Sequence, residues 1–456
     1  MPNAEFLGVD LAQNHIDDAE SGVANLNLTN IRFRQMDVAE MTVDEFGKFD
    51  YIIAHGLFSW VPEFVRDRVL SLCAEMLAEN GVGYISYNAF PGAHYRRMVQ
   101  SMLRFHTRTK SEPIGKVGSA MSFLAFLAEN SAGGEIYRSI LQTELERHFE
   151  HDAADIYHDD LSDQNRAYYF YEFDSMLRQN GLKYLGEAEL HAMGTGGLSA
   201  EAREFAASID DIHEREQYLD MIRGRIFRQT LFCRSEINLD HKPEATVIGK
   251  FSFASSVKPA SPKPDLASSR IERFVGSKGV SIRIDHPLTK AALVELGNEW
   301  GGAIQFDELA GRARVGLEAL GYKSPDWAAE TATLGALLLQ LCLETSAFEV
   351  HLFQPRSSQS VPARPRVNAL ARWQLPQAEN VLTMLNLDVR IEDAVSRRLL
   401  ELLDGTRDSA ESLAELRLFV ETSDAVEDPA ELLSRLGEWH AQSIAQLARL
   451  GMFDSE

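Results

Sequence analysis

Two aspartates that follow predicted β-strands are the first residues of this sequence that could bind a cofactor. Asp10 ends the apolar run at residues 6–11, and Asp37 follows residues 31–36, about 27 positions later. In open parallel sheets, ligands bind at the carboxyl ends of the strands. Asp10 could accept two hydrogen bonds from ribose hydroxyls, and Asp37 could accept one from an adenine amine. A single Asp at a strand end is more often a helix cap or turn former, but the pair favours a cofactor site.

Two further strand ends carry polar side chains. His55 and Gly56 follow the apolar run at residues 51–54, and Tyr87 and Asn88 end the run at residues 82–87. Because the ends of parallel strands meet at one edge of a sheet, we expect these residues to lie near the same site. A histidine on its own more often has a structural role, so His55 alone is weak evidence for a functional site.

The elements that must position these residues alternate between strand and helix. The predicted strands are at residues 6–11, 31–36, 49–55 and 82–87. A helix is predicted at residues 65–78, closed by Asn80 and Gly81. This alternation predicts an α/β fold with a doubly wound, Rossmann-like parallel sheet.

The composition excludes several classes of protein. The 456 residues include 45 Lys and Arg and 68 Asp and Glu, which gives a net charge of -23. Binding to nucleic acid is disfavoured because it relies on clustered basic residues. No apolar run is long enough to span a membrane, no secretory signal is present, and the three cysteines lack metal or disulfide spacing. We therefore predict a cytoplasmic protein. Its acidic surface serves solubility or, less often, a basic substrate.

The rest of the chain reads as mainly helical. Residues 110–240 are rich in Phe, Tyr and Leu, and residues 250–269 carry three prolines among small residues, which predicts a stiff, exposed linker. Beyond it, three helices and a strand within residues 286–353 predict a winged helix. A weaker repeat follows to residue 450. The predicted helix at 326–343 has no basic residue, so this half favours protein contact over DNA.

Two side-chain clusters have both a structural and a functional interpretation. His148 and His151 are three positions apart, with Asp152 and Asp155 nearby, but without a third well-placed ligand a solvated helix face is favoured over a metal site. We therefore predict no metal. The aromatic residues between Tyr168 and Phe173 favour core packing, with a lysine-binding cage as the alternative.

The same motifs resemble a known family. The segments AEFLGVDLA, NIRFRQMDVAEM, FDYIIAHGLFSWVP and GVGYISYNAFPGAHYRRMV occur in the order seen in class I S-adenosylmethionine-dependent methyltransferases that carry a methyltransferase regulatory domain. This group includes bacterial protein-lysine methyltransferases. The resemblance continues through YYFYEFDSMLRQNGLKYLGEAEL, LDMIRGRIFRQTLFCR and DHPLTKAAL, so it covers almost the whole chain. The motifs are specific for this family when they occur together, but each motif alone is weak evidence.

The resemblance implies a role for each matching residue. The ribose would be held by Asp10 with Leu11, the adenine by Asp37 and Val38, and the methionine portion by His55 and Gly56. The acceptor entrance would be lined by Trp60, Tyr87, Asn88 and His94. Tyr87, Asn88 and His55 are the candidate catalytic residues, and the cofactor would be S-adenosylmethionine.

The sequence departs from the family pattern at three places. The family has a first strand and a GxGxG loop ahead of the segment at residues 6–11, and it tends to have Trp and Tyr where this chain has Ala93 and Phe58. Without the loop, several hydrogen bonds of roughly 1 kcal/mol each would be lost and the sheet would have open edges. Two accounts are left open: a start recorded too late, which we favour, or decay into a binding protein. A form extended upstream is expected to bind the cofactor.

These observations predict four regions. They are a methyltransferase domain at 1–110, incomplete at its N-terminus, a regulatory domain at 111–248, a linker at 249–270 and a winged-helix-like region at 271–456. The predicted function is methyl transfer to lysine side chains of a protein. A catalytically silent scaffold and a small-molecule methyltransferase are the alternatives, and a homodimer is left open. Transfer would be an in-line displacement, with aromatic rings near the amine and either Asn88 or a backbone carbonyl orienting its lone pair. His55 could accept a proton, but the sequence indicates no single base.

Overall fold

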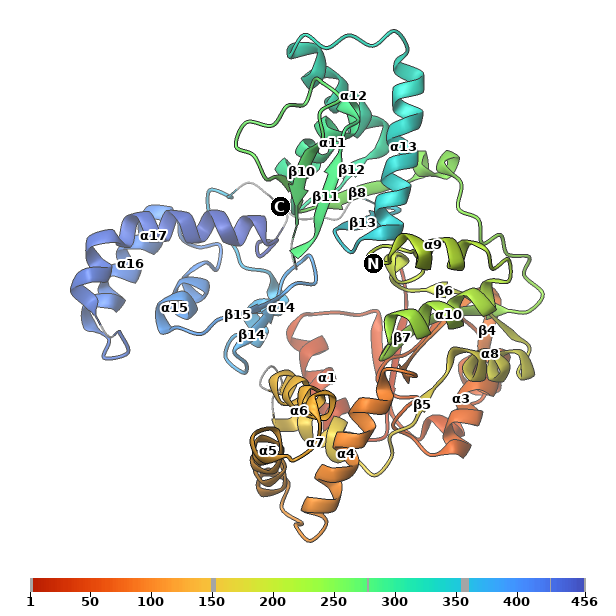
Figure 1. Cartoon of the computed structure of the whole chain (residues 1–456). Coiled ribbons are helices and arrows are strands. Elements are labelled where there is room, and N and C mark those ends of the chain that lie inside the picture. The colour runs from red at the N-terminus through yellow and green to blue at the C-terminus, as the bar shows by residue number, and fades with distance from the viewer. Residues whose placement is uncertain (1–2, 149–152, 277–278, 354–360, 427, 455–456) are drawn as a thin grey trace. The chain divides into compact units, whose positions relative to one another are not determined.

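The computed structural model describes residues 3–148, 153–276, 279–353, 361–426 and 428–454 (Figure 1). The chain divides into two compact units. One contains residues 1–36 and 243–456, and the other contains residues 37–242. Among the described residues, every helix is too short or too polar to cross a bilayer.

The chain begins with a small parallel ladder. Strand β1 (Phe6–Asp10) pairs with β2 (Ile31–Gln35), and α1 (Gln13–Asn25) connects them. No residue of either strand is fully buried. Gly8 allows Phe33 to lie across β1, because a Cβ at this position would come within 2.4 Å of the Phe33 ring. Both strands confirm the sequence prediction.

A second sheet forms the centre of the unit at residues 37–242. Its strand order is β3-β4-β7-β6, with β5 paired to β4. The strands are β3 (Phe49–Ala54), β4 (Leu77–Ala89), β5 (Ala167–Tyr168), β6 (Leu182–Glu187) and β7 (Phe227–Arg234). Pairing is parallel between β3 and β4 and between β4 and β5, and antiparallel elsewhere.

The predicted parallel strands therefore lie in two separate ladders. Within the described residues, β1 pairs with β2 and β3 pairs with β4, and no ladder joins the two pairs. Strands β6 and β7 come from the predicted regulatory domain, yet they pair with each other and with β4 of the predicted methyltransferase domain. The two predicted domains thus share one sheet.

One face of this sheet is covered by two helices, α3 (Glu63–Met76) and α8 (Phe170–Gln179). Val69 of α3 and Phe173 of α8 pack with Ile85 of β4 in one buried cluster. Three short helices precede α3 or follow β6: η1 (Val38–Glu40), α2 (Val43–Phe46) and η2 (Leu190–Ala192). The prediction that Asn80 and Gly81 end the helix is wrong. The helix ends at Met76, and both residues lie inside β4, in the irregular stretch between the pairs Phe49–Leu77 and Tyr51–Val82.

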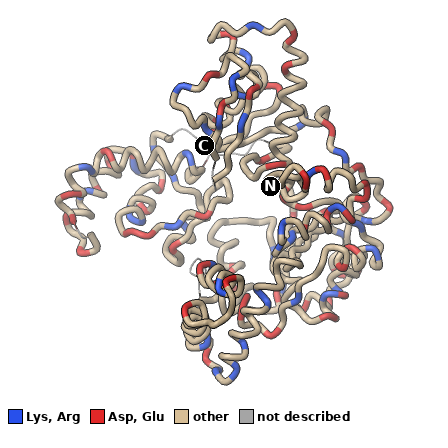
Figure 2. Tube along the Cα trace, in the orientation of Figure 1, with Lys and Arg blue, Asp and Glu red and all other residues tan. Residues whose placement is uncertain are grey.

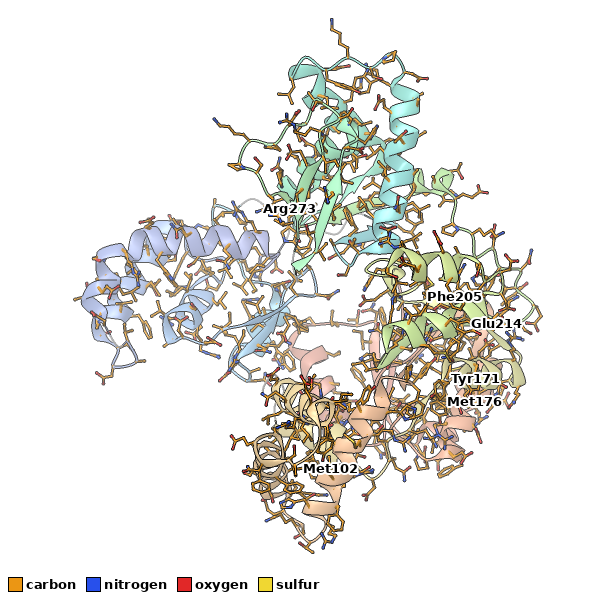
Figure 3. The ribbon with its side chains drawn as sticks, in the orientation of Figure 1. Met102, Tyr171, Met176, Phe205, Glu214 and Arg273 are labelled. Atoms are coloured by element: carbon orange, nitrogen blue, oxygen red, sulfur yellow. The ribbon has the colours of Figure 1, made fainter. Side chains whose placement is uncertain are left out.

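Four helices pack around a core of their own in the same unit. They are α4 (Ala93–Thr107), α5 (Pro113–Asn130), α6 (Glu135–His148) and α7 (Ala153–Leu161), and they lie together in Figure 1. Figure 3 labels Met102 of α4 in this group, and its sulfur accepts a hydrogen bond from Tyr137 at 3.4 Å. Helices α9 (Ala200–Ala207) and α10 (Ile212–Arg223) follow. The helical character predicted after residue 110 is confirmed.

The segment after residue 243 begins with a buried strand. The short helix η3 (Ala245–Lys250) leads into β8 (Ser252–Ser255), which lies between β12 (Ile304–Gln305) and β13 (Phe348–His351). Residues 252–255 are buried, so they are not part of an exposed linker as predicted. Phe253 contributes to the core, and the prolines that suggested a linker come after this strand.

The order of helices and strand predicted for residues 286–353 is confirmed. Helices α11 (Pro287–Asn298), α12 (Phe306–Ala319) and α13 (Trp327–Glu344) precede β13 and share its core. A separate three-stranded sheet contains β9 (Lys258–Pro259), β10 (Glu272–Val275) and β11 (Ser281–Ile284). Lys290 of α11 fixes the loop before β10, because its buried ammonium donates to the carbonyls of Asp265, Ser268 and Arg270.

The last part of the chain has a further core. Its elements are α14 (Ala369–Gln374), β14 (Asn380–Leu382), β15 (Asp388–Arg390), α15 (Ala394–Leu402), α16 (Ser409–Thr422) and α17 (Pro429–Arg449). Trp373 of α14 packs against Gly22 of α1, where a Cβ would come within 3.2 Å of the indole. This contact explains why residues 1–36 group with the C-terminal half.

Candidate active site

Asp10 forms a tight turn directly after β1. Its Oδ1 accepts a hydrogen bond from the Ala12 amide at 2.7 Å, and its Oδ2 lies 3.5 Å from Nδ1 of His15. Leu11 is exposed beside it. Asp10 therefore acts as a turn former, the alternative that the sequence left open, and a role in binding ribose stays a prediction.

Asp37 begins the other compact unit and has a similar local role. It caps η1, where its Oδ1 accepts from the Ala39 amide at 2.9 Å. Val38 packs partly against the core beneath β3 and β4. As with Asp10, the turn engages one carboxylate oxygen in the described contacts. Among the described contacts, Asp37 thus keeps one oxygen with which an amine of a cofactor could bond, whereas the second oxygen of Asp10 faces His15.

His55 and Gly56 turn the chain at the end of β3. The Gly56 amide donates to Oγ of Ser86 at 2.9 Å, which ties the turn to the neighbouring strand β4. Gly56 has a φ of 65°, and a Cβ there would meet no heavy atom within 4 Å. The backbone at this point is therefore open to a ligand. His55 is exposed, and its Nδ1 lies 2.8 Å from the hydroxyl of Tyr84.

The loop after β3 also reaches the end of β4. The Asn88 amide donates to Oγ of Ser59 at 2.9 Å. The next residue, Trp60, is partly buried, and its ring lies 4.9 Å from that of His158 in α7. The structure thus connects three predicted segments, the turn at His55, the loop at Trp60 and the strand end at Asn88, through hydrogen bonds within one unit.

Tyr87 does not lie at an open entrance. Its side chain is 1% exposed, and its ring stacks on Phe173 at 4.2 Å. No described residue forms a hydrogen bond with its hydroxyl, and burial raises the pKa of this hydroxyl. Its location is the hydrophobic core beneath β4, so the predicted role in acceptor binding would require a change of position.

His94 is exposed near the start of α4. Its ring stacks on Phe90 at 4.0 Å, and its Nε2 lies 3.2 Å from the hydroxyl of Tyr169. In the aromatic run, Tyr168, Phe170 and Phe173 are buried, which confirms core packing. Tyr171 is exposed on α8 and is labelled in Figure 3 with Met176 of the same helix.

A buried ionic cluster behind β4 was missed by the sequence analysis. The Arg228 side chain is fully buried and bonds to Glu187 at 2.5 Å, Glu216 at 3.0 Å and Asp220 at 2.8 Å. Arg228 pairs across the sheet with Tyr87 of β4. Burial raises the pKa values of Glu216 and Asp220. An arginine within an apolar strand, FRQTLFCR, was the available signal, because such a residue needs buried partners.

His148 contradicts its predicted place on a solvated face. Its side chain is fully buried, and Nε2 lies 2.8 Å from Oδ2 of Asp160. Its proposed companions His151 and Asp152 lie outside the described residues. Within the described part of the chain, no group of three or more His, Cys, Asp or Glu side chains could hold a metal ion.

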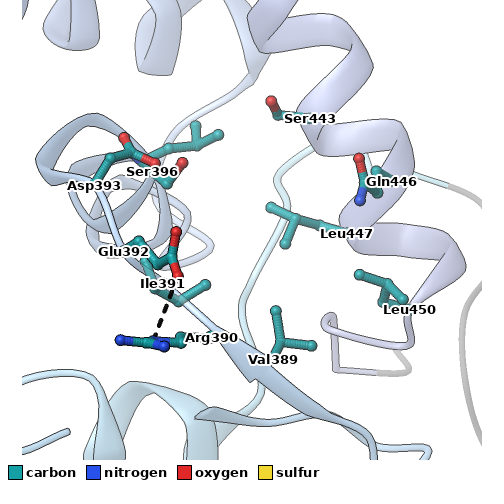
Figure 4. Close-up of a pocket in the computed structure, with 11 residues that line it drawn as sticks. Val389, Arg390, Ile391, Glu392, Asp393, Ser396, Ser443, Gln446, Leu447 and Leu450 are labelled. Atoms are coloured by element: carbon teal, nitrogen blue, oxygen red, sulfur yellow. Dashed lines mark hydrogen bonds and ion pairs between the residues drawn. The ribbon is translucent and has the colours of Figure 1, made fainter. Parts of the chain in front are cut away.

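Charged residues of both signs are spread along the described part of the chain, as Figure 2 shows. A pocket of about 180 Å³ lies between the β15–α15 turn and α17 (Figure 4). Its polar lining includes Arg390 and Glu392, which are 3.5 Å apart and largely exposed. This ion pair is therefore in contact with solvent.

Comparison with known families matches three parts of the chain. Residues 1–81 match a methyltransferase domain, residues 152–234 match the predicted methyltransferase regulatory domain, and residues 363–452 match the C-terminal winged helix domain of PKMT. The second repeat that the sequence suggested near residues 395–450 therefore corresponds to a recognised winged helix domain.

Two similar curated proteins are described as uncharacterized. One from Rickettsia prowazekii is 31% identical over 322 residues, which are 69% of this chain and 58% of the relative. One from Synechocystis is 26% identical over 255 residues, 56% of this chain and 50% of the relative. The chain thus spans little more than half the length of these relatives.

A solved structure shares the fold. It is described as PKMT2 from Rickettsia typhi in complex with AdoHcy, and it matches with a TM-score of 0.84 and 24% identity over 99% of this chain and 90% of its own. A second structure of PKMT2 matches equally well over 99% of this chain and 89% of its own. The comparisons confirm the resemblance: separate parts of the chain match a methyltransferase domain, a methyltransferase regulatory domain and a PKMT C-terminal winged helix domain, and the fold is that of PKMT2.

Proposed function

We propose that this chain transfers the methyl group of S-adenosylmethionine to lysine side chains of a protein. The observation that carries the proposal is the joined pair of strand ends at Gly56 and Asn88. Ser86 and Ser59 hydrogen-bond to these two backbone amides, so the ends of β3 and β4 have a fixed relation. Such an edge is where parallel sheets bind ligands.

Cofactor binding is proposed for the residues that match the motifs of the family. Asp10 and Leu11 would hold the ribose, and Asp37 with Val38 would hold the adenine. His55 and Gly56 would lie beneath the methionine portion, where the open backbone at Gly56 leaves room. The methyltransferase-domain match and the AdoHcy named for PKMT2 support the choice of cofactor. When bound, S-adenosylmethionine would supply an electrophilic methyl group.

The protein's task would then be to hold a neutral amine in line with that methyl group and to exclude water. Trp60 offers an aromatic face for the incoming lysine, since an indole attracts a cationic ammonium. The Asn88 carboxamide would accept a hydrogen bond from the amine and so orient its lone pair. His55 is exposed and close to Tyr84, so it could pass a proton to solvent. His94 would border the entrance.

The domain order supports a protein acceptor. A small acceptor needs neither the helices of residues 93–161 nor the cores formed after residue 243. The winged helix match names PKMT, which fits a role in presenting a protein substrate. The proposed division is a catalytic region at 1–110, a regulatory region at 111–248 and a C-terminal region whose first strand is β8.

Methyl-labelled S-adenosylmethionine tests the proposal directly. The 456-residue chain would be incubated with a cell-protein extract whose lysines are either free or acetylated. We expect label in the untreated extract only, with methyl-lysine found by mass spectrometry. Equal label in both extracts would indicate another acceptor side chain, and label among small molecules would indicate a small-molecule methyltransferase. No transfer to any fraction would favour a silent scaffold.

A further inference from the structure

A series of hydrogen-bonded side chains leads inward from Asn88 through Asn165 and Gln100 to Asp160. It is called the positioning line below. The Asn88 Nδ2 donates to Oδ1 of Asn165 at 3.0 Å, and the Asn165 Nδ2 donates to Oε1 of Gln100 at 3.0 Å. The Gln100 Nε2 then donates to Oδ1 of Asp160 at 3.1 Å. Asn88 lies on β4, Gln100 on α4 and Asp160 on α7, so the line joins the strand end to the helical group.

The inner end of this line is an ionised carboxylate. Burial alone would raise the pKa of Asp160, but the hydrogen bond from His148 and the charges of Arg96 and Arg147 outweigh it and hold the pKa well below its usual range. The His148 Nδ1 faces the carbonyl of Glu144, and Nε2 faces Asp160.

An ionised carboxylate fixes the direction of every amide in the line. A carboxamide can be turned around, and its orientation is set by its partners. Asp160 can only accept, so Gln100 presents its NH₂ group to it. The carbonyl of Asp159 also accepts from Gln100 at 3.0 Å and from Asn165 at 3.4 Å. The Asp160 carboxylate and the Asp159 carbonyl can only accept hydrogen bonds. They therefore fix which end of the Gln100 and Asn165 carboxamides is the NH₂ group.

The orientation of the Asn165 carboxamide in turn fixes the orientation of the Asn88 carboxamide. Its NH₂ group must face Asn165, because the Asn165 oxygen is the atom turned toward it. The Asn88 Oδ1 is left pointing away from the line, and within the described part of the chain no hydrogen bond to this oxygen is found. The residue is 7% exposed. One carbonyl oxygen is thus presented at the strand end.

We propose that Asn165, Gln100 and Asp160 are positioning residues that hold Asn88 with its Oδ1 toward the acceptor amine. This inference rests on the proposed function. An amine that donates one N–H to a fixed oxygen has its lone pair directed elsewhere, and in-line transfer requires that direction to be toward the methyl group. An Asn88 side chain free to turn around would present its NH₂ group instead, which repels an ammonium and cannot accept from an amine.

A double-mutant cycle on the full chain tests the coupling. Asn165→Leu removes the acceptor that holds Asn88, and we expect kcat for methyl transfer to fall about tenfold, the size of one hydrogen bond. Affinity for S-adenosylmethionine should not change. Asn88→Ala should cause a similar loss, and the double variant should be no worse than Asn88→Ala alone. Losses that multiply in the double variant would overturn the proposal.

Two further variants separate positioning from general damage. Asn165→Asp keeps an oxygen that accepts from Asn88 but loses the donor to Gln100 and to the Asp159 carbonyl, so it should recover part of the activity lost in Asn165→Leu. The neighbouring Gln164 is exposed, and Gln164→Leu should leave transfer unchanged. If Asn165→Leu does not fold, Gln100→Met interrupts the line one step further inward and should give a smaller loss that Asn88→Ala likewise masks.

A readout independent of catalysis distinguishes the two proposals. The side-chain NH₂ resonances of Asn88, identified by their absence in Asn88→Ala, should shift in Asn165→Leu and not in Gln164→Leu. If the wild-type chain transfers no methyl group but these shifts occur, the proposed function fails and the positioning line stands. If transfer occurs and the resonances do not respond to Asn165→Leu, the positioning line is wrong.

Discussion

The two parallel ladders of this protein differ sharply in how they are packed. In β1 and β2, no side chain is fully buried. In β4, residues 85–89 are all buried, and Tyr87 lies in the hydrophobic core next to Arg228, its partner across the sheet. Strand β3 stands between these extremes. Ile52 and Ala54 pack into the core, while Tyr51 and Ile53 are 72% and 70% exposed.

This difference in packing follows the division of the proposed site into residues proposed to bind the cofactor and residues proposed to bind the acceptor. Asp10, the proposed ribose ligand, lies on the ladder of β1 and β2, and its carboxylate bonds only to near neighbours in the chain. Asn88 lies near the end of the buried strand β4 and is connected through Asn165 and Gln100 to the buried carboxylate of Asp160. We therefore expect the acceptor half to be rigid without ligand, and the cofactor half to gain order when a ligand binds.

The largest effect is expected when the ionic cluster behind β4 is broken. Arg228→Leu would leave three buried carboxylates without their shared cation, and stability should fall by about 3–5 kcal/mol. Urea unfolding followed by circular dichroism measures the loss, and hydrogen exchange assigns it to residues 37–242. Arg138 is exposed on α6, so Arg138→Leu is the control and should change stability by less than about 0.5 kcal/mol. Equal effects would contradict the account.

Matched truncations in the two ladders compare their packing directly. Ile85 of β4 is completely buried, and Ile85→Ala should cost about 2–5 kcal/mol. Val9 of β1 is partly exposed, and Val9→Ala should cost less than about 1 kcal/mol because little area leaves the interior. The same urea experiment serves for both. A Val9→Ala cost as large as that of Ile85→Ala would show that the ladder of β1 and β2 is a stabilising core.

Acid should weaken the acceptor half through Asp160. In the folded chain its pKa lies well below the usual range, so between that pKa and about pH 4 only the unfolded chain binds this proton. Stability should therefore fall as the pH drops below about 4, by up to ~1.4 kcal/mol per pH unit for this group. Asp160→Asn should flatten that slope in acid unfolding curves. An unchanged slope would place the titrating group elsewhere.

The smallest effect is expected for the hydroxyl of Tyr87. Tyr87→Phe removes a buried oxygen that has no described hydrogen bond, so stability should stay within about 1 kcal/mol or rise. Methyl transfer should be unchanged, in contrast to Asn88→Ala. Activity assays on the two variants test the contrast. If Tyr87→Phe loses methyl transfer but keeps its stability, the Tyr87 hydroxyl takes part in the acceptor site after all.

Local pattern was enough to predict the strands and most helices. The alternation at residues 1–100 located β1, β2 and β3, and the helical periodicity after residue 286 located α11, α12 and α13. The pattern failed where tertiary contacts overrode local preference. Asn80 and Gly81 look like a helix stop but lie inside β4, between the residues that pair with Phe49 and Tyr51 of β3, and β8 is buried between two strands distant in the sequence.

The sequence predicted the strand-end residues of the candidate site, but it did not predict the residues that hold them in place. Strand-end position identified Asp10, Asp37, His55 and Asn88. The residues behind them, such as Asn165, Gln100 and Asp160, are common polar side chains on helices and loops. Only the fold brings them within hydrogen-bonding distance of each other. His148 shows the same limit, because its burial depends on the packing of α6 against its neighbours.

Calorimetric titration of S-adenosylmethionine is the most direct test of the central claim. The wild-type chain, Asp37→Ala and Asn88→Ala would be compared. The account predicts saturable binding to the wild type, a loss of about tenfold or more in Asp37→Ala from the missing hydrogen bond to a charged group, and unchanged affinity in Asn88→Ala. No saturable heat with the wild type, or affinity lost in Asn88→Ala and kept in Asp37→Ala, would contradict it.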